Sequence, residues 1–250
     1  MHNYFEKEFE LRFFEMNRLG EASPIAMLTL LQEAAAEHCD YAGHNLLSLM
    51  SENTGWVLLS GVMQMERYPL YKEKIIIRTW ISKYYAVRGV RENIIYDKDY
   101  NIIGRARGLW LFYDIKRRRP IKIHPDFLEK WSSYESIPLN HSITNKIKPL
   151  NFFEYQKEFR VNMYDTDTNK HVNNLRYLQW LIESIPDEIL NNYYLYFIDG
   201  RFISEAQYGD VILSSTKRDI VDNSFIHTIK IKGTNKVCAT GKTTWKKIDK

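Results

Sequence analysis

Two stretches of the chain, FEKEFELRFFEMN at residues 5–17 and YQKEFRVNMYDTD at residues 155–167, carry the same pattern 150 residues apart. Each alternates apolar and polar side chains, which is typical of a half-buried strand. Each is followed by an apolar stripe at helical spacing and then by further alternating segments. Because self-similarity at a fixed offset indicates a repeated structural unit, the sequence predicts that this chain is a duplication.

The helix in each copy has recognisable ends. In the first copy, Ser23 is a suitable N-cap with Pro24 at the favoured first position, and Gly43 can end the helix. In the second copy, Asn173 is expected at the cap, and Pro186 stops the helix. The predicted apolar stripes consist of Leu28, Leu31, Ala35, His38 and Ala42 in the first helix, and of Leu175, Leu178, Ile182 and Ile185 in the second.

Strand patterns fill the rest of each copy, so the fold class is α+β. Each unit is expected to be a curled antiparallel sheet around one central helix, because that arrangement buries the helix stripe against one sheet face. We place the first unit at residues 1–130, a linker rich in polar residues at 131–150, and the second unit at 151–250. A plain two-domain protein without a shared site is the structural alternative.

Composition limits the classes of function. A net charge of +4 is too small to indicate nucleic-acid binding, and the longest apolar runs are too short to span a membrane. Two distant cysteines, Cys39 and Cys238, favour buried thiols in a reducing cytoplasm over a disulfide. With no metal-ligand spacing and no glycine-rich phosphate loop, we expect neither a metal ion nor another cofactor.

The copies differ where short polar side chains precede the second helix. Asp167, Asn169 and His171 occupy alternate positions there, whereas the first copy has Asn17, Leu19 and Glu21. If the segment is extended, alternate side chains point to one side, beside the N–H groups of a helix start that could bind an oxyanion. Helix capping and turn formation are the structural alternative, which we accept for Asp165, Thr166 and Asn174. One active site per chain is therefore expected.

The segment DTNKHVNNLRYLQW resembles the D-x-N-x-H-V-N-N signature of plant and bacterial acyl-acyl carrier protein thioesterases. The resemblance extends to GWVLLSGVMQMERYPLYKEKIIIRTW and GRARGLWLFYDIKRRRP in the first copy, and so covers nearly the whole chain. It implies a tandem pair of hot-dog units, which agrees with the duplication. It also implies hydrolysis of fatty acyl-acyl carrier protein to free fatty acid and carrier protein, which ends chain elongation.

The resemblance also implies a catalytic glutamate in the strand after the second helix, and Glu205 stands at that position. Ala206 replaces the cysteine that commonly follows it in the family, which argues against a thiol nucleophile. The expected mechanism has Glu205 as the base for a water molecule, or as the nucleophile itself. Asn169 would position the water, and His171, oriented by Asp167, would polarise the carbonyl or protonate the leaving thiolate.

The first unit keeps its apolar elements without the polar set, so we expect it to hold the acyl chain. Candidate lining residues, for which plain core packing is the alternative, are Met27, Leu28, Leu31, Trp56 and Leu58. The basic residues Arg117, Arg118, Arg119 and Lys122 form either a solvated turn or a docking patch for an acidic carrier protein. The protein is expected to be a monomer or a homodimer.

Two other functions remain open at the level of sequence. A coenzyme A thioesterase of the same superfamily needs the same carbonyl chemistry, and differs only in the carrier of the acyl group. A non-catalytic acyl-binding module would use the polar set as a helix cap only. Hydrolysis of one acyl group on both carriers distinguishes the first alternative, and acyl binding without thiol release would identify the second.

Overall fold

A computed structural model describes residues 4–125, 127, 131, 139, 141–167, 171–221 and 223–248. The chain divides into two compact units, residues 1–143 and 144–250. The division falls inside the linker expected at 131–150. Within the described part, no helix has the length and apolar character needed to cross a membrane.

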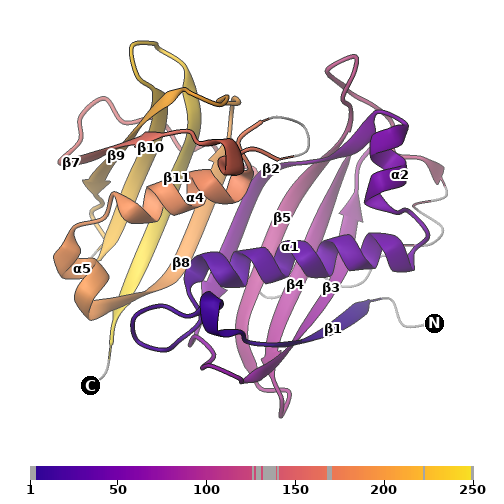
Figure 1. The fold of residues 1–250 in the computed structure, drawn as a ribbon, viewed down its shortest axis with the longest axis horizontal. Helices are drawn as coiled ribbons and strands as arrows, with labels where there is room; N and C mark the ends of the chain where they lie inside the picture. Colours follow the sequence, from indigo (N-terminus) through magenta and orange to yellow (C-terminus); the bar gives the residue numbers. More distant parts are fainter. Residues whose placement is uncertain are drawn as a thin grey trace. The chain divides into compact units, whose positions relative to one another are not determined.

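The first unit is an antiparallel sheet around a long helix (Figure 1). Its strands pair in the order β1-β3-β4-β5-β2, with the short β6 on β5. The elements are β1 (Phe5–Glu10), η1 (Phe13–Glu15), α1 (Pro24–Tyr41), α2 (Leu46–Ser51), β2 (Thr54–Met65), β3 (Lys74–Tyr84), β4 (Arg88–Asp97), β5 (Ile102–Asp114) and β6 (Arg119–Pro120).

The second unit repeats this plan. Its strands pair in the order β7-β9-β10-β11-β8, which is the order of the first unit with each strand replaced by its counterpart. The elements are β7 (Tyr155–Arg160), η2 (Met163–Asp165), α4 (Asn174–Glu183), α5 (Asp187–Asn192), β8 (Tyr193–Phe202), β9 (Val211–Arg218), β10 (Ser224–Ile231) and β11 (Val237–Lys247). The duplication predicted from the sequence is confirmed.

The helix starts follow the sequence signals, but the buried face of α4 does not. The side chains of Ser23 and Asn173 cap α1 and α4 as predicted, and α1 ends just before Gly43. In α4 the predicted Leu175 and Ile182 are only half-buried. Leu178 is buried as predicted, together with Tyr177, Trp180 and Leu181. The prediction of the stripe missed the aromatic residues, whose large apolar surfaces determine which face packs on the sheet.

Close packing of α4 on its sheet depends on two glycines that face each other across β8 and β11. Gly200 pairs with Gly241. A Cβ atom at these positions would lie 2.6 Å from Leu178 Cδ2 and 2.7 Å from Leu181 Cδ1, respectively. These distances are too short for non-bonded carbon atoms, so a larger residue at either position would force Leu178 or Leu181 to move.

Described residues of the linker region accept hydrogen bonds from side chains of the sheets. In the first unit, the Arg107 guanidinium donates to the carbonyl oxygens of Leu139 and His141, and the Ser60 hydroxyl donates to that of Ile143. In the second unit, Arg201 Nε donates to the carbonyl oxygen of Asn145. Side chains of the sheets thus satisfy backbone carbonyl groups in the described part of this segment.

A buried polar chain in the second unit makes stability sensitive to acid. His227 is fully buried between Thr216 Oγ1 and Thr243 Oγ1, each 2.9 Å from one of its ring nitrogens. Burial lowers the pKa of His227 to about 3. In the unfolded chain this histidine has its ordinary pKa of about 6.5. At pH values between the two pKa values, the unfolded chain therefore binds a proton that the folded protein does not.

Because the unfolded state binds more protons in this window, stability should fall as the pH falls from about 6.5 towards 3. At pH 5 the contribution of His227 is a loss of about 2 kcal/mol. Urea unfolding at pH 7 and pH 5 measures this loss, and His227→Gln should make the decline shallower. Equal declines in the two proteins would show that His227 does not carry the effect.

Candidate active site

The two described ends of the polar segment before α4 pair with each other. Thr166 and Val172 form an antiparallel bridge, and the Asp167 N–H donates to the His171 carbonyl oxygen at 2.8 Å. The chain therefore reverses direction between these residues. The predicted alternation of side chains runs through residues 168–170, which lie outside the described residues, and it stays a prediction. Asn169 lies outside the described residues.

The first unit contains equivalent hydrogen bonds, which give the Asp167 carboxylate a structural role. This carboxylate accepts from the His171 N–H at 3.4 Å. At the equivalent place, Asn17 Oδ1 accepts from the Glu21 N–H at 3.3 Å, and the Asn17 N–H donates to the Glu21 carbonyl oxygen. A short side chain that accepts from the backbone within its own turn is a common turn-forming device. This contact of Asp167 is therefore common to both units.

His171 and Glu205 distinguish the second unit from the first. His171 Nε2 lies 3.2 Å from Glu205 Oε2, and the two side chains are 26% and 45% exposed. Glu205 belongs to the β8–β9 loop, just beyond the strand in which it was expected. The duplication places Glu21 and Tyr68 at the equivalent positions of the first unit. An imidazole and a carboxylate in contact, within reach of solvent, can together activate a water molecule.

Three side chains hold the β8–β9 loop, which we define as residues 203–210. The Ala206 N–H donates to the Tyr177 hydroxyl at 2.8 Å, and the Ser204 hydroxyl donates to the Val237 carbonyl oxygen. Lys236 Nζ donates to the carbonyl oxygen of Glu205. The sequence analysis did not predict these contacts. Tyr177 lies on α4, Ser204 in the loop itself and Lys236 in the turn between β10 and β11, so no local pattern relates them. The sequence did contain one indication, because a buried tyrosine on α4 needs a hydrogen-bond partner for its hydroxyl.

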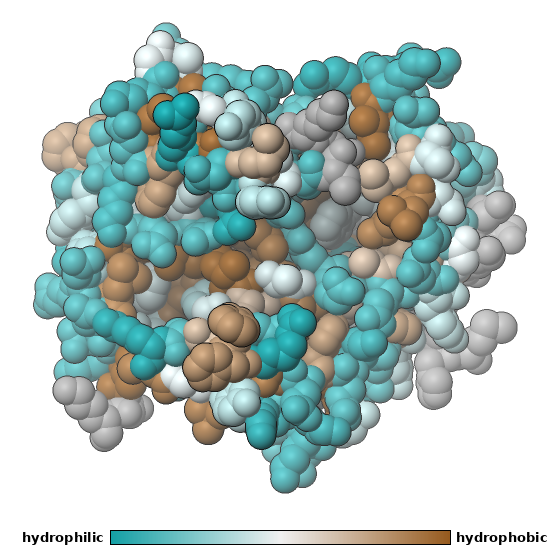
Figure 2. All heavy atoms as spheres, in the orientation of Figure 1, coloured by the Kyte–Doolittle hydropathy of each residue, from teal (hydrophilic) through white to brown (hydrophobic). Residues whose placement is uncertain are grey.

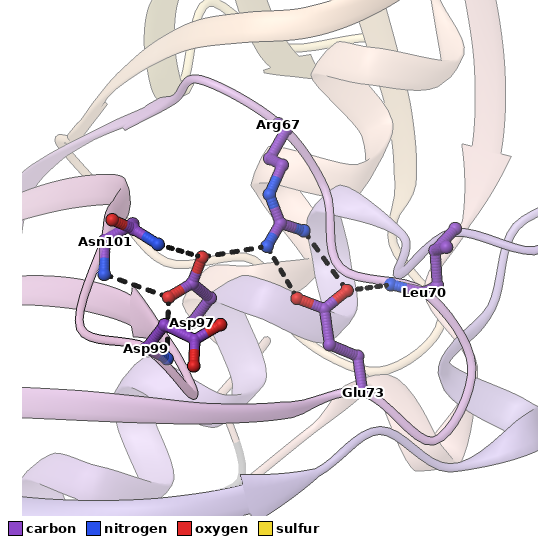
Figure 3. A network of polar contacts seen from close by, with 6 residues as sticks. All are labelled: Arg67, Leu70, Glu73, Asp97, Asp99 and Asn101. Carbon is purple, nitrogen blue, oxygen red and sulfur yellow. Dashed lines mark hydrogen bonds and ion pairs between the residues drawn. The ribbon is translucent and has the colours of Figure 1, made fainter.

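The equivalent loop of the first unit is held by charges instead (Figure 3). Arg67 forms ion pairs with Glu73 and Asp97, and the Leu70 N–H donates to Glu73 Oε2. Burial favours a higher pKa for Glu73, but the hydrogen bonds from Arg67 and Leu70 bring it below its ordinary value. The contact of Leu70 with Glu73 has a counterpart in the second unit, where the Gln207 N–H donates to Asp210.

Tyr177→Phe tests whether the loop must be held for catalysis. Phenylalanine keeps the ring packed against Trp180 and Phe202, but removes the acceptor for the Ala206 N–H. An unsatisfied buried N–H costs about 1–3 kcal/mol, so the loop should shift and misplace Glu205. For the thioester hydrolysis that the resemblance implies, we expect kcat to fall about tenfold with little change in KM. Unchanged kcat would mean that the loop is positioned without this bond.

Backbone N–H groups at the start of α4 already donate hydrogen bonds within the protein. The N–H groups of Val172 and Asn173 donate to the carbonyl oxygens of Ala206 and Asp165. Those of Leu175 and Arg176 donate to the side chain and the carbonyl oxygen of Asn173. These four groups are therefore not available to an oxyanion, contrary to expectation, because the turn and the helix cap use them.

Cys238 lies close to the loop, although it is distant in sequence. Its carbonyl oxygen accepts from the N–H groups of Ile203 and Ser204, and its Sγ lies 3.9 Å from Ser204 Oγ. Cys238 is far from Glu205 in the sequence, but pairing of β8 with β11 brings it beside the loop. The side chain is fully buried, and burial raises its pKa. A protonated, buried thiol is a poor nucleophile.

The expected acyl-chain residues lie in the first unit at different depths. Met27 and Leu31 are buried on α1, while Leu28, Trp56 and Leu58 are half-buried. The basic residues Arg117, Arg118, Arg119 and Lys122 are exposed at and after the turn that joins β5 to β6. Arg117 is anchored there by its N–H, which donates to Asp114 Oδ1.

Comparison with known protein families agrees with this arrangement. Residues 2–131 match the model of the acyl-ACP thioesterase N-terminal domain, and residues 152–247 match that of the acyl-ACP thioesterase C-terminal domain. The chain belongs to the acyl-ACP thioesterase family. It is a thioester hydrolase, and its two units are tandem hot-dog units, as the resemblance implied.

Two similar curated proteins come from plants. The chain is 23% identical to oleoyl-acyl carrier protein thioesterase 1 of Arabidopsis thaliana, over 97% of this chain and 76% of that protein. It is 25% identical to a palmitoyl-acyl carrier protein thioesterase of Cuphea hookeriana, over 97% of this chain and 62% of that protein. The chain thus spans between about three fifths and three quarters of the length of these two chloroplastic relatives.

Solved structures show the same fold over the whole chain. An acyl-ACP thioesterase from Bacteroides thetaiotaomicron superposes with a TM-score of 0.87 at 22% identity, covering 98% of both chains. The 12:0-ACP thioesterase from Umbellularia californica gives a TM-score of 0.86 at 21% identity, covering 99% of both chains. Sequence has thus diverged widely while the order of elements is kept.

Proposed function

We propose that this chain hydrolyses the thioester of fatty acyl-acyl carrier protein through His171 and Glu205. The observation that supports this site is the contact of imidazole with carboxylate in the second unit only. Hydrolysis needs a group that removes a proton from water and a group that supplies one to the departing sulfur, and this pair can do both.

In the proposed reaction, Glu205 removes a proton from a water molecule, whose oxygen bonds to the thioester carbonyl carbon. The carbon–sulfur bond then breaks, the thiolate of the phosphopantetheine arm takes a proton from His171, and His171 takes the proton held by Glu205 across their contact. Asp167 keeps the turn that carries His171, and Asn169 is assigned to the attacking water. Tyr177, Ser204 and Lys236 hold the loop so that Glu205 meets the imidazole. No cofactor is needed for these steps.

The acyl chain is proposed to lie in the first unit. The half-buried side chains of Leu28, Trp56 and Leu58 are the ones that a chain could contact. The buried Met27 and Leu31 would support them from the helix core. A change of Trp56 to alanine should therefore alter the preferred chain length, which a panel of saturated acyl chains measures.

The basic turn of Arg117, Arg118, Arg119 and Lys122 is proposed to attract the acidic carrier protein. Replacing the three arginines by glutamine should lower kcat/KM severalfold at low ionic strength and flatten its dependence on salt, since charge attraction at this range is screened by ions. The measurement is kcat/KM between about 20 and 300 mM salt. Identical salt dependence in both proteins would exclude a steering role for the turn.

The direct test is release of the carrier thiol from a panel of acyl-acyl carrier proteins, alongside the same acyl groups on coenzyme A. Preference for the carrier protein supports the proposed substrate, and preference for coenzyme A identifies a coenzyme A thioesterase. Acyl binding without thiol release from any donor would mean that the chain is a binding module. The cytoplasmic location is likewise a proposal, to be tested by fractionation.

A further inference from the structure

Large apolar side chains are exposed around the candidate active site. Met163 and Tyr164 in η2 are 59% and 92% exposed, and Ile203 and Tyr208 in the β8–β9 loop are 56% and 62% exposed. We name these four residues the catalytic-loop patch. Single exposed apolar residues are normal, but large ones that gather beside a reaction site are typical of binding surfaces.

Backbone hydrogen bonds place the two parts of the patch next to each other. The Val161 N–H donates to the Asp210 carbonyl oxygen, and the Gly209 N–H donates to the Val161 carbonyl oxygen. The Val172 N–H donates to the carbonyl oxygen of Ala206. Because η2 begins two residues after Val161, it lies against the loop that carries Glu205. Met163 and Tyr164 therefore lie in a segment that is bonded to the loop carrying Glu205.

Basic side chains flank the patch. Arg160 is exposed at the end of β7, opposite Val211, and within the described residues its guanidinium makes no ion pair. Lys236 is exposed and contacts the backbone of Glu205 itself. These two cations stand at the edge of the apolar centre, beside the loop carboxylates of Glu205 and Asp210, and can pair with acidic side chains of a partner that also presents apolar ones.

We propose that the catalytic-loop patch is the docking surface for the acyl carrier protein. This inference rests on the proposed function, because it takes the carrier protein as the partner. The thioester is tethered to its carrier by the phosphopantetheine arm, so the carrier must bind within reach of His171 and Glu205. A surface on the loop that carries Glu205, and on the segment bonded to that loop, meets this requirement. The exposed aromatic side chains are the residue type that most often dominates binding energy at such interfaces.

The first unit provides a matched control. Phe13 and Phe14 in η1 are 69% and 98% exposed, and Phe13 packs edge-on against Tyr71 with ring centroids 5.9 Å apart. Hydrophobic side chains over η1 are visible on the surface in Figure 2. These positions are equivalent to Met163, Tyr164 and Tyr208, but the loop beside them has Tyr68 in place of the catalytic glutamate.

The experiment compares Tyr164→Ser/Tyr208→Ser with Phe14→Ser/Tyr71→Ser on two substrates, acyl-acyl carrier protein and the pantetheine thioester of the same acyl chain. For the patch variant, KM for the carrier protein substrate should rise about tenfold or more, with kcat and all constants for the pantetheine thioester unchanged. The control variant should match the parent protein on both substrates. Binding of fluorescently labelled holo-carrier protein, measured by anisotropy, should weaken by the same factor.

Other outcomes would overturn the proposal. Equal losses on both substrates would show that the patch acts on the reaction and not on docking. No loss for the patch variant, or a loss for the control variant alone, would place the docking surface elsewhere. If the parent protein releases no thiol from any carrier substrate, the proposed function fails. The anisotropy measurement still tests docking by itself, so the two failures are distinguishable.

Discussion

Glu205→Gln is expected to lower kcat by about 10²–10⁴ on fatty acyl-acyl carrier protein. Glutamine keeps the size of the side chain and can still contact His171, but it cannot accept a proton from water. The side chain is 45% exposed, so folding should be unaffected. Single-turnover thiol release at saturating substrate is the measurement, because it isolates the chemical step.

A matched control is Glu158→Gln, which removes another exposed carboxylate of the second unit from its ion pair with Lys232. It should leave kcat unchanged. His171→Asn should lower kcat to a similar degree as Glu205→Gln, and the double variant should lose little more, because residues that act as one unit are not additive. Near-normal turnover in both single variants would exclude this pair as the catalytic machinery.

Arg107→Met is expected to destabilise the protein by about 3–5 kcal/mol. Arg107 lies directly opposite Glu92 on β4 and β5, and its Nε donates to both carboxylate oxygens at 2.8 and 2.9 Å. The Glu92 side chain is 1% exposed. Removing its partner leaves a buried carboxylate without its cation. Chemical unfolding of the variant beside the parent protein measures the loss.

The exposed pair of Lys74 with Glu8 is the control, since both side chains are more than half exposed. Lys74→Met should cost less than about 1 kcal/mol, as is usual for surface ion pairs. Adding Glu92→Gln to Arg107→Met should recover part of the loss, but not all of it. The linker carbonyl oxygens of Leu139 and His141 would still lack their donor. A small loss for Arg107→Met would mean that water or a rearrangement solvates Glu92.

Much of the fold could be predicted because its signals are local. The alternation in residues 5–10 and 155–160 identified equivalent strands, and Ser23 and Asn173 identified equivalent helix starts. Such patterns depend on neighbours within one or two turns of chain, which the sequence displays directly. The buried face of α4 was predicted less well, since packing of Tyr177 and Trp180 against the sheet outweighs the spacing of the leucines.

The candidate site was only partly predictable. The difference between the two copies singled out His171, and the family resemblance singled out Glu205. Neither could reveal that Asp167 contacts the backbone of its own turn, as Asn17 does in the first unit. The hydrogen bond from Ala206 to Tyr177 and the nearness of Cys238 were also missed. These contacts join residues far apart in the chain, and no local pattern marks them.

The sequence by itself determined that the protein is a duplicated α+β chain with polar chemistry in its second copy. Periodicity, helix caps and the offset between copies are all properties of short segments. Only the tertiary structure decided that the imidazole of His171 meets the carboxylate of Glu205, and that the neighbouring N–H groups are already used. Those outcomes depend on strand pairing and on the packing of α4, which bring separate segments to within hydrogen-bond distance.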